Sequence, residues 1–220
     1  MESASGQIVE GLWQFEALLP DWTEPDTDED GWEESVGWWA LATAGGLVLI
    51  DPLVDDWDAV DRLVAAGGGC RAVLRTCHWH QRSIADVARR YDVGVWARPL
   101  SDGQASYTPD HGVRDGDEPF DGVRVIDVER DDEMALWLSH QRALIFGDAM
   151  IRTHAGTLRI CPESWTQPAG GPARLRSLLG AFTDLPVEHV LVSHGPLVMG
   201  DGLASLRRAT ASGPVTERSS

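Results

Sequence analysis

Two histidines that are one residue apart are the residues with the clearest capacity for chemistry. His78 and His80 follow the apolar segment 72–74 and precede segment 84–91, which has the apolar spacing of a helix. Side chains that stand where a strand gives way to a loop can converge on one point, and imidazole is a common metal ligand. The pair therefore indicates part of a metal site.

Two more candidate ligands stand at the same kind of position. Asp148 follows the apolar segment 143–146, and His194 follows segment 187–192. Strand ends on one side of a sheet are where functional sites are commonly built. Imidazole and carboxylate ligands together suit zinc, iron or manganese. The candidate ligands are His78, His80, Asp148 and His194.

The apolar and turn patterns predict the elements that position these residues. Predicted strands span 8–15, 36–43, 47–50, 71–76, 93–97, 123–128, 134–138, 143–146 and 187–192. One predicted helix begins after a cap on Asp55 or Asp56, and three others span 84–91, 172–182 and 203–209. Segment 149–171 reads as a long connection. The early strands are joined by a hairpin, so we expect mixed sheets covered by helices.

Composition favours one domain over residues 1–211, followed by a disordered tail at 212–220. The chain has 220 residues, 43% of them hydrophobic, which is enough for a sizeable core. An acidic loop at 21–34 carries eight carboxylates. It is either a solvated loop or a lid, since Trp22 and Trp32 could cover a pocket.

The net charge indicates which classes of partner are unfavourable, and the cysteine content indicates the cellular compartment. A net charge of −17 argues against nucleic acid or an anionic membrane surface as the main partner. Three cysteines form no disulfide framework, which favours a reducing compartment. With no signal-like segment and no long apolar run, we expect a cytoplasmic protein that binds a small molecule; its oligomeric state is left open.

In this order, the motifs resemble the metallo-β-lactamase superfamily. A strand ending in Asp51 precedes a helix and then a stretch similar to the signature His-x-His-x-Asp-His, which would begin at His78. Gly147-Asp148 and His194-Gly195 resemble two later motifs of the superfamily. The resemblance covers about residues 8–209. It implies an αββα sandwich of two mixed sheets flanked by helices, and a hydrolase of a small ester, lactone, thioester or related substrate.

The chain departs from the signature in ways that limit this implication. Arg82 and Ser83 stand where the superfamily has Asp and His, and segment 128–134 lacks a further expected histidine. A standard two-metal site cannot be assembled from these residues. One interpretation is a single divalent metal held by the four candidate ligands, with Asp148 also orienting a water molecule. A nearby carboxylate could replace the missing histidine; the candidates are Glu129, Asp131, Asp132 and Glu133.

Two other interpretations need no metal. Arg82 could act as a surrogate cation that pairs with Asp148, leaving a degenerate site used for ligand binding or assembly. It could also simply point to solvent. Alternatively, a histidine could act as a general base. His154 could reach the site from its loop, whereas Cys77 and Trp79 are expected to point away from their histidine neighbours and pack in the core.

Overall fold

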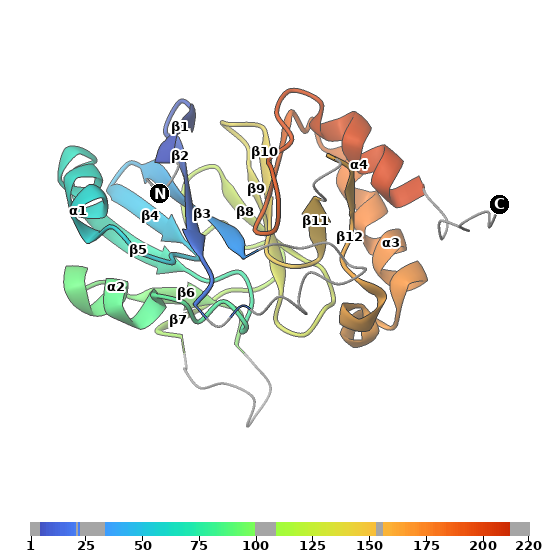
Figure 1. Cartoon of the computed structure of the whole chain (residues 1–220), viewed down its shortest axis with the longest axis horizontal. Coiled ribbons are helices and arrows are strands. Elements are labelled where there is room, and N and C mark those ends of the chain that lie inside the picture. The colour runs from blue at the N-terminus through green and yellow to red at the C-terminus, as the bar shows by residue number, and fades with distance from the viewer. Residues whose placement is uncertain (1–4, 21, 23–33, 100–108, 153–155, 212–220) are drawn as a thin grey trace.

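The structure is a computed structural model that describes residues 5–20, 22, 34–99, 109–152 and 156–211. Two β-sheets lie face to face, and helices cover the outer face of each sheet (Figure 1). This layering buries both faces of each sheet, as the strongly apolar strands require. The predicted αββα sandwich of two mixed sheets is confirmed.

The first sheet holds its strands in sequence order. They are β1 (Ser5–Val9), β2 (Leu12–Leu18), β3 (Ser35–Thr43), β4 (Gly46–Ile50), β5 (Cys70–Leu74), β6 (Val95–Ala97) and β7 (His111–Gly112). Neighbours run antiparallel from β1 to β4 and parallel from β4 to β7. The change occurs at β4 because the chain leaves it through a helical crossover. The carboxyl ends of β4 and β5 therefore meet at one edge.

The second sheet has the order β13–β10–β9–β8. Its strands are β8 (Val123–Asp127), β9 (Met134–Leu138), β10 (Ala143–Phe146) and β13 (His189–Val192). β8, β9 and β10 are antiparallel neighbours, whereas β10 and β13 run parallel with Phe146 opposite Val192. Asp148 follows Phe146 by two residues, and His194 follows Val192 by two residues. The register of β10 and β13 therefore brings Asp148 and His194 to the same edge of the second sheet.

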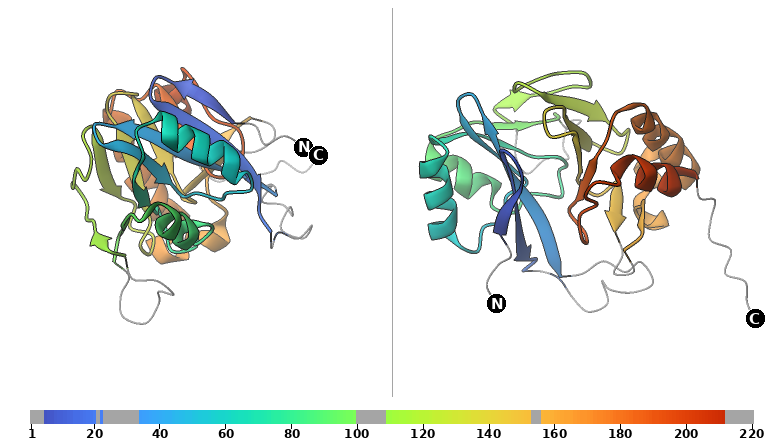
Figure 2. Two further views of the ribbon diagram at one scale, coloured as in Figure 1. Left: turned by 90° about the vertical axis from the view of Figure 1, so that its left-hand side faces the viewer. Right: turned by 90° about the horizontal axis from the view of Figure 1, so that it is seen from above.

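Helices cover the two outer faces at opposite ends of the molecule (Figure 2). α1 (Trp57–Ala66) and α2 (Ile84–Tyr91) lie on the first sheet, and α3 (Pro172–Gly180) and α4 (Gly202–Ala211) lie on the second. Short 3-10 helices are η2 (Glu163–Trp165), η3 (Gln167–Ala169) and η4 (Ala181–Asp184). The Asp56 carboxylate accepts a hydrogen bond from the Ala59 amide at 2.9 Å and caps α1.

Strand alternation divides the core into layers. On β4, Val48 and Ile50 pack between the two sheets, whereas Leu47 and Leu49 pack beneath the helices of the first sheet. A third apolar cluster lies between the second sheet and its helices α3 and α4. The two sheets are thus fixed against each other, and the loops at their shared edge start from a rigid base.

Two stretches differ from the prediction. Segment 8–15 contains the turn between β1 and β2, where Gly11 takes a φ of 73°. The connection 149–171 contains a hairpin of β11 (Met150–Arg152) and β12 (Leu158–Ile160). Strands of three residues are too short to show an alternating pattern, which is why the sequence did not reveal them.

Some predicted features fall outside the described residues. These are the tail 212–220, His154, Trp32, and nearly all of the acidic loop 21–34. None of the helices in the described part of the chain is both long enough and apolar enough to cross a membrane.

Candidate metal centre

Cys77 and His80 lie in the turn that follows β5. The strand ends at Leu74, so its alternation no longer decides where the following side chains point. Within the turn, the His80 amide donates to the Cys77 carbonyl oxygen at 3.2 Å, and both side chains face the same place. As expected, Cys77 points away from its neighbour His78 and its thiol is buried. It does not pack among apolar side chains alone, however, because it lies beside His80 and Asp148.

Asp51, which follows β4, orients the His80 ring. Its Oδ2 lies 2.8 Å from His80 Nδ1, and its Oδ1 accepts the Thr76 amide at 2.8 Å. The Thr76 hydroxyl also donates to Oδ2. Because the carboxylate engages Nδ1, Nε2 is the nitrogen that faces the site. Carboxylates support metal-binding histidines in this way.

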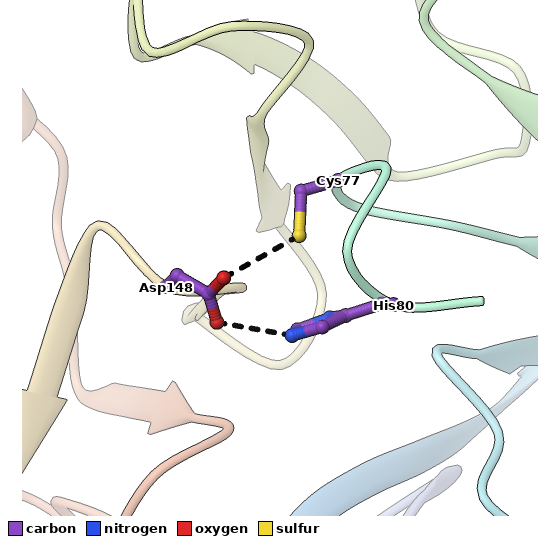
Figure 3. A group of neighbouring side chains, drawn as sticks. All are labelled: Cys77, His80 and Asp148. Atoms are coloured by element: carbon purple, nitrogen blue, oxygen red, sulfur yellow. Dashed lines mark hydrogen bonds and ion pairs between the residues drawn. The ribbon is translucent and has the colours of Figure 1, made fainter. Parts of the chain in front are cut away.

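Asp148 is the point on which the side chains converge. Its Oδ1 lies 3.0 Å from His80 Nε2 and 3.2 Å from His194 Nε2. Its Oδ2 accepts from the Cys77 thiol at 3.7 Å. Figure 3 shows Cys77 and His80 reaching from one turn toward Asp148, which stands on another. The edge between the two sheets therefore collects polar groups from both.

Cys77, His80 and Asp148 form a buried group that could hold one metal ion. One ligand atom from each lies within 4.8 Å of the others. A thiolate, an imidazole and a carboxylate together fit zinc and related divalent metals, so the donor chemistry matches such an ion. His194 is not part of this group, although its Nε2 contacts the same Asp148 oxygen as His80 Nε2.

Burial and neighbouring charges set the protonation of the central pair. Burial and Arg82 lower the pKa of His80, but Cys77 and the Asp51 and Asp148 carboxylates together raise it well above its usual value. Burial raises the pKa of Asp148, yet the charge of His80 lowers it well below the ordinary range. The two carboxylates on either side of the His80 ring therefore favour its protonated form.

The Cys77 thiol is also protonated in the absence of a metal. Burial raises the pKa of Cys77 to about 12. A metal ligand must give up its proton, so binding of an ion to Cys77 and His80 would release protons.

Arg82 points into the site. Its Nη2 lies 3.2 Å from His80 Nε2, and its Nη1 donates to the carbonyl oxygens of Gly37 and Asp51, each at 3.0 Å. Nε2 offers either one hydrogen or one lone pair, so Asp148 and Arg82 make competing demands on it. A metal ion bound at Nε2 would compete with the Arg82 guanidinium for this position. The interpretation that Arg82 points to solvent is wrong.

A buried ion pair supports Asp148 from behind. Glu133 Oε1 accepts the amides of Asp148 and Ala149, each at 2.7 Å, and Glu133 Oε2 pairs with Arg130 Nη1. Arg130 Nε donates to the Trp165 carbonyl oxygen at 2.8 Å, and Arg130 Nη1 lies 3.9 Å from Asp148 Oδ2. The backbone that carries Asp148 is thereby held in place.

A pocket of about 360 Å³ opens onto this centre. Its polar lining consists of His80, Arg82, Arg130, Asp131, Asp148, Ser164 and His194. Its apolar lining consists of Leu19, Val36, Trp79, Trp165 and Pro168. Trp79 is 66% exposed, contrary to the expectation that it packs in the core. Trp165 packs edge-on against the His194 ring, with the two ring centroids 5.8 Å apart.

The family model described as "Metallo-beta-lactamase superfamily" matches residues 22–212. The chain belongs to this superfamily. No curated protein matched the sequence. The resemblance seen in the motifs is thus confirmed at the level of the family.

Solved structures of metallo-β-lactamases share the fold at low identity. VMB-1 at pH 5.5 is 13% identical with a TM-score of 0.71, over 96% of this chain and 95% of that one. DIM-1 is 12% identical with a TM-score of 0.69, and the match covers 96% of this chain and 97% of DIM-1. FIM-1 from Pseudomonas aeruginosa, in a mono-zinc form, is 14% identical with a TM-score of 0.65, over 96% and 97%. These likenesses show the shared architecture.

His78 matches the signature in sequence, but the structure does not bring it into the group of Cys77, His80 and Asp148. His78 Nδ1 lies 2.7 Å from Asp132 Oδ1, which also accepts the His78 amide at 2.9 Å. Arg75, fully buried, lies 3.6 Å from the other Asp132 oxygen. The turn thus directs the His78 ring to Asp132, and Cys77 takes the position beside His80.

The acidic segment supplies no ligand to the group that could hold a metal. Asp132 is engaged by His78, both oxygens of Glu133 are engaged as described above, and Glu129 pairs with the exposed Arg174. Asp131 is exposed and lines the pocket. Sequence reasoning also missed Arg130. The available signal was that Arg130 is the single basic residue within the acidic segment 129–133.

Proposed function

We propose that this chain is a metal-dependent hydrolase with a single-metal centre. The supporting observation is that His80 and His194 meet at one oxygen of Asp148 while Cys77 approaches the other. The superfamily and the adjoining pocket support a small ester, lactone, thioester or related compound as substrate.

The chain's own residues take distinct parts in this proposal. Cys77, His80 and Asp148 would hold the ion, with His194 as a fourth ligand, and the mono-zinc form of FIM-1 supports zinc as its identity. Zinc, when bound, supplies Lewis acidity and lowers the pKa of water. Asp51 fixes the His80 ring, and the carboxylate of Asp148 also accepts a hydrogen bond from the attacking water.

Metal content tests the centre. Protein purified without chelator is expected to carry about one equivalent of a divalent transition metal. His80→Ala should lose this metal, whereas His78→Ala should keep it, because His78 is bound to Asp132. Less than about a tenth of an equivalent, even after incubation with zinc, iron and manganese, would contradict the proposal. Hydrolysis of chromogenic esters and lactones, lost in His80→Ala, is the corresponding test of turnover.

One observation supports a second candidate function, a metal-free binding protein. Arg82 Nη2 already lies 3.2 Å from His80 Nε2, so the guanidinium can serve as the cation of the site. Under this reading the wild type binds no metal and Arg82→Ala creates metal binding. Under the leading proposal the wild type binds metal and Arg82→Ala retains it.

A further inference from the structure

Two guanidinium groups line the same pocket. Arg82 reaches it from the turn after β5, and Arg130 reaches it from the loop between β8 and β9. Arg130 is 4% exposed, and its Nε and Nη1 are engaged by Trp165 and Glu133. Among the described residues, none accepts a hydrogen bond from its Nη2, so this nitrogen can donate to a ligand in the pocket.

Glu133 pairs with Arg130 Nη1 from behind the pocket, whereas the two carboxylates that line the pocket have other partners or are exposed. Asp148 Oδ1 already has two partners, since His80 Nε2 lies 3.0 Å from it and His194 Nε2 lies 3.2 Å from it. Asp131 is exposed, so water and salt screen its charge. The two arginines therefore present hydrogen-bond donors and positive charge to the pocket, and guanidinium groups suit carboxylate, sulfonate or phosphate oxygens.

The rest of the wall is apolar. Trp79 and Trp165 offer aromatic surface, and Leu19, Val36 and Pro168 complete it. A small polar anion alone would leave this surface in contact with water. A ligand with an apolar body and one anionic group satisfies both parts of the lining.

We propose that the pocket recognises a small amphipathic anion whose acidic group is bound by Arg82 and Arg130 and whose apolar body lies against Trp79 and Trp165. This names the substrate class of the proposed hydrolase and rests on that function only for turnover. Binding itself needs the two arginines and the aromatic wall, with or without a metal.

A matched pair of fluorescent probes tests the proposal. Chelator-treated protein is titrated with anilinonaphthalene sulfonate and, separately, with N-phenylnaphthylamine, the same ring system without the sulfonate. The sulfonate should bind to one site about tenfold or more tightly than the neutral probe, as expected for a hydrogen-bonded charged pair. Arg82→Gln and Arg130→Lys should each remove about that factor for the sulfonate only.

Arg207→Gln is the control, because it removes one exposed positive charge from α4, outside the pocket lining. It should leave both probes unchanged. Lysine at position 130 keeps a charge beside Glu133, so the fold is expected to survive, and circular dichroism checks this. If Arg130→Lys does not fold, Arg82→Gln decides. Equal binding of the two probes, or unchanged sulfonate binding in Arg82→Gln, overturns the proposal.

The same preparations separate this inference from the proposed function. Protein that never holds a metal but binds the sulfonate through its arginines refutes the metal centre and supports the anion site. Protein that holds one metal but does not discriminate between the probes supports the centre and refutes the anion site.

Discussion

At the scale of single residues, two residues of the site have a left-handed backbone conformation. Asp51 has a φ of 50° and Arg82 a φ of 35°, which are left-handed conformations that cost non-glycine residues of order 1 kcal/mol or more. The bonds from Arg82 Nη1 to the carbonyl oxygens of Gly37 and Asp51 help to hold this geometry. Strain of this kind is typical of functional sites, where side-chain direction matters more than local stability.

Asp51→Asn tests whether His80 is positioned for a metal. Asparagine can still accept the Thr76 amide, but it cannot supply the negative charge beside His80 Nδ1. Metal affinity, measured by competition with a chromophoric chelator, should fall about 10- to 100-fold. Asp58→Asn, an exposed change on α1, is the control and should not alter the affinity. An affinity for Asp51→Asn within about twofold of wild type would contradict this role.

At the scale of elements, the loop after β13 depends on a glycine. Gly195 follows His194 with a φ of 94°, and a Cβ there would lie 1.8 Å from the carbonyl oxygen of Arg152 on β11. The Arg152 amide donates to the His194 carbonyl oxygen at 2.9 Å, so the two chains are closely paired. No side chain fits between them, and the glycine thereby fixes where His194 stands.

Gly195→Ala should therefore cost more than about 3 kcal/mol in the free energy of unfolding, measured with urea. Gly180→Ala is the matched control, because Gly180 is helical and an added Cβ meets nothing within 4 Å. That change should be neutral or slightly stabilising. A loss below about 1 kcal/mol for Gly195→Ala would show that β11 can move away.

The two helices on the first sheet are joined by an exposed polar cluster. Asp61 lies on α1, and both of its partners lie on α2. Asp61 forms an ion pair with Arg90 and accepts a hydrogen bond from the Tyr91 hydroxyl at 2.6 Å. Hydrogen bonds from Arg90 and then Tyr91 lower the pKa of Asp61 to about 2. The ordinary pKa of an aspartate is 3.8, and in the folded protein that of Asp61 is lower. The charged carboxylate therefore stabilises the fold at pH values above 3.8, and this contribution is lost as the pH falls toward 2.

Asp61→Asn should consequently lower the melting temperature at pH 7, by an amount that salt reduces. The difference from wild type should shrink as pH is lowered below about 4, because both proteins then carry an uncharged group. Thermal melts across this range measure it. A difference that stays constant down to about pH 2.5 would contradict the assigned pKa.

At the scale of the whole molecule, the order of strands and helices could be predicted because each longer element is marked by its own apolar period. His80, Asp148 and His194 could be placed together because each follows a strand whose end lies at one edge of a sheet. The choice between Cys77 and His78 could not be made from sequence. It depends on a turn, and turns follow no side-chain period.

The same reason explains the other differences. Arg130 and Asp132 lie in a loop whose partners come from distant segments, so local pattern carries no signal for their roles. The superfamily signature indicated where to look, but it placed the ligand at His78 in a chain whose turn presents Cys77. The centre joins the two sheets, since Cys77 and His80 come from the first and Asp148 and His194 from the second.

Cobalt substitution tests this centre most directly. Chelator-treated protein loaded with Co²⁺ should show a sulfur-to-cobalt charge-transfer band in the near ultraviolet, because Cys77 is within reach of the ion. The band should persist in Cys70→Ser, a change to the partly exposed cysteine at the start of β5, and disappear in Cys77→Ser. A protein that binds Co²⁺ without this band, or that keeps the band in Cys77→Ser, would contradict the account.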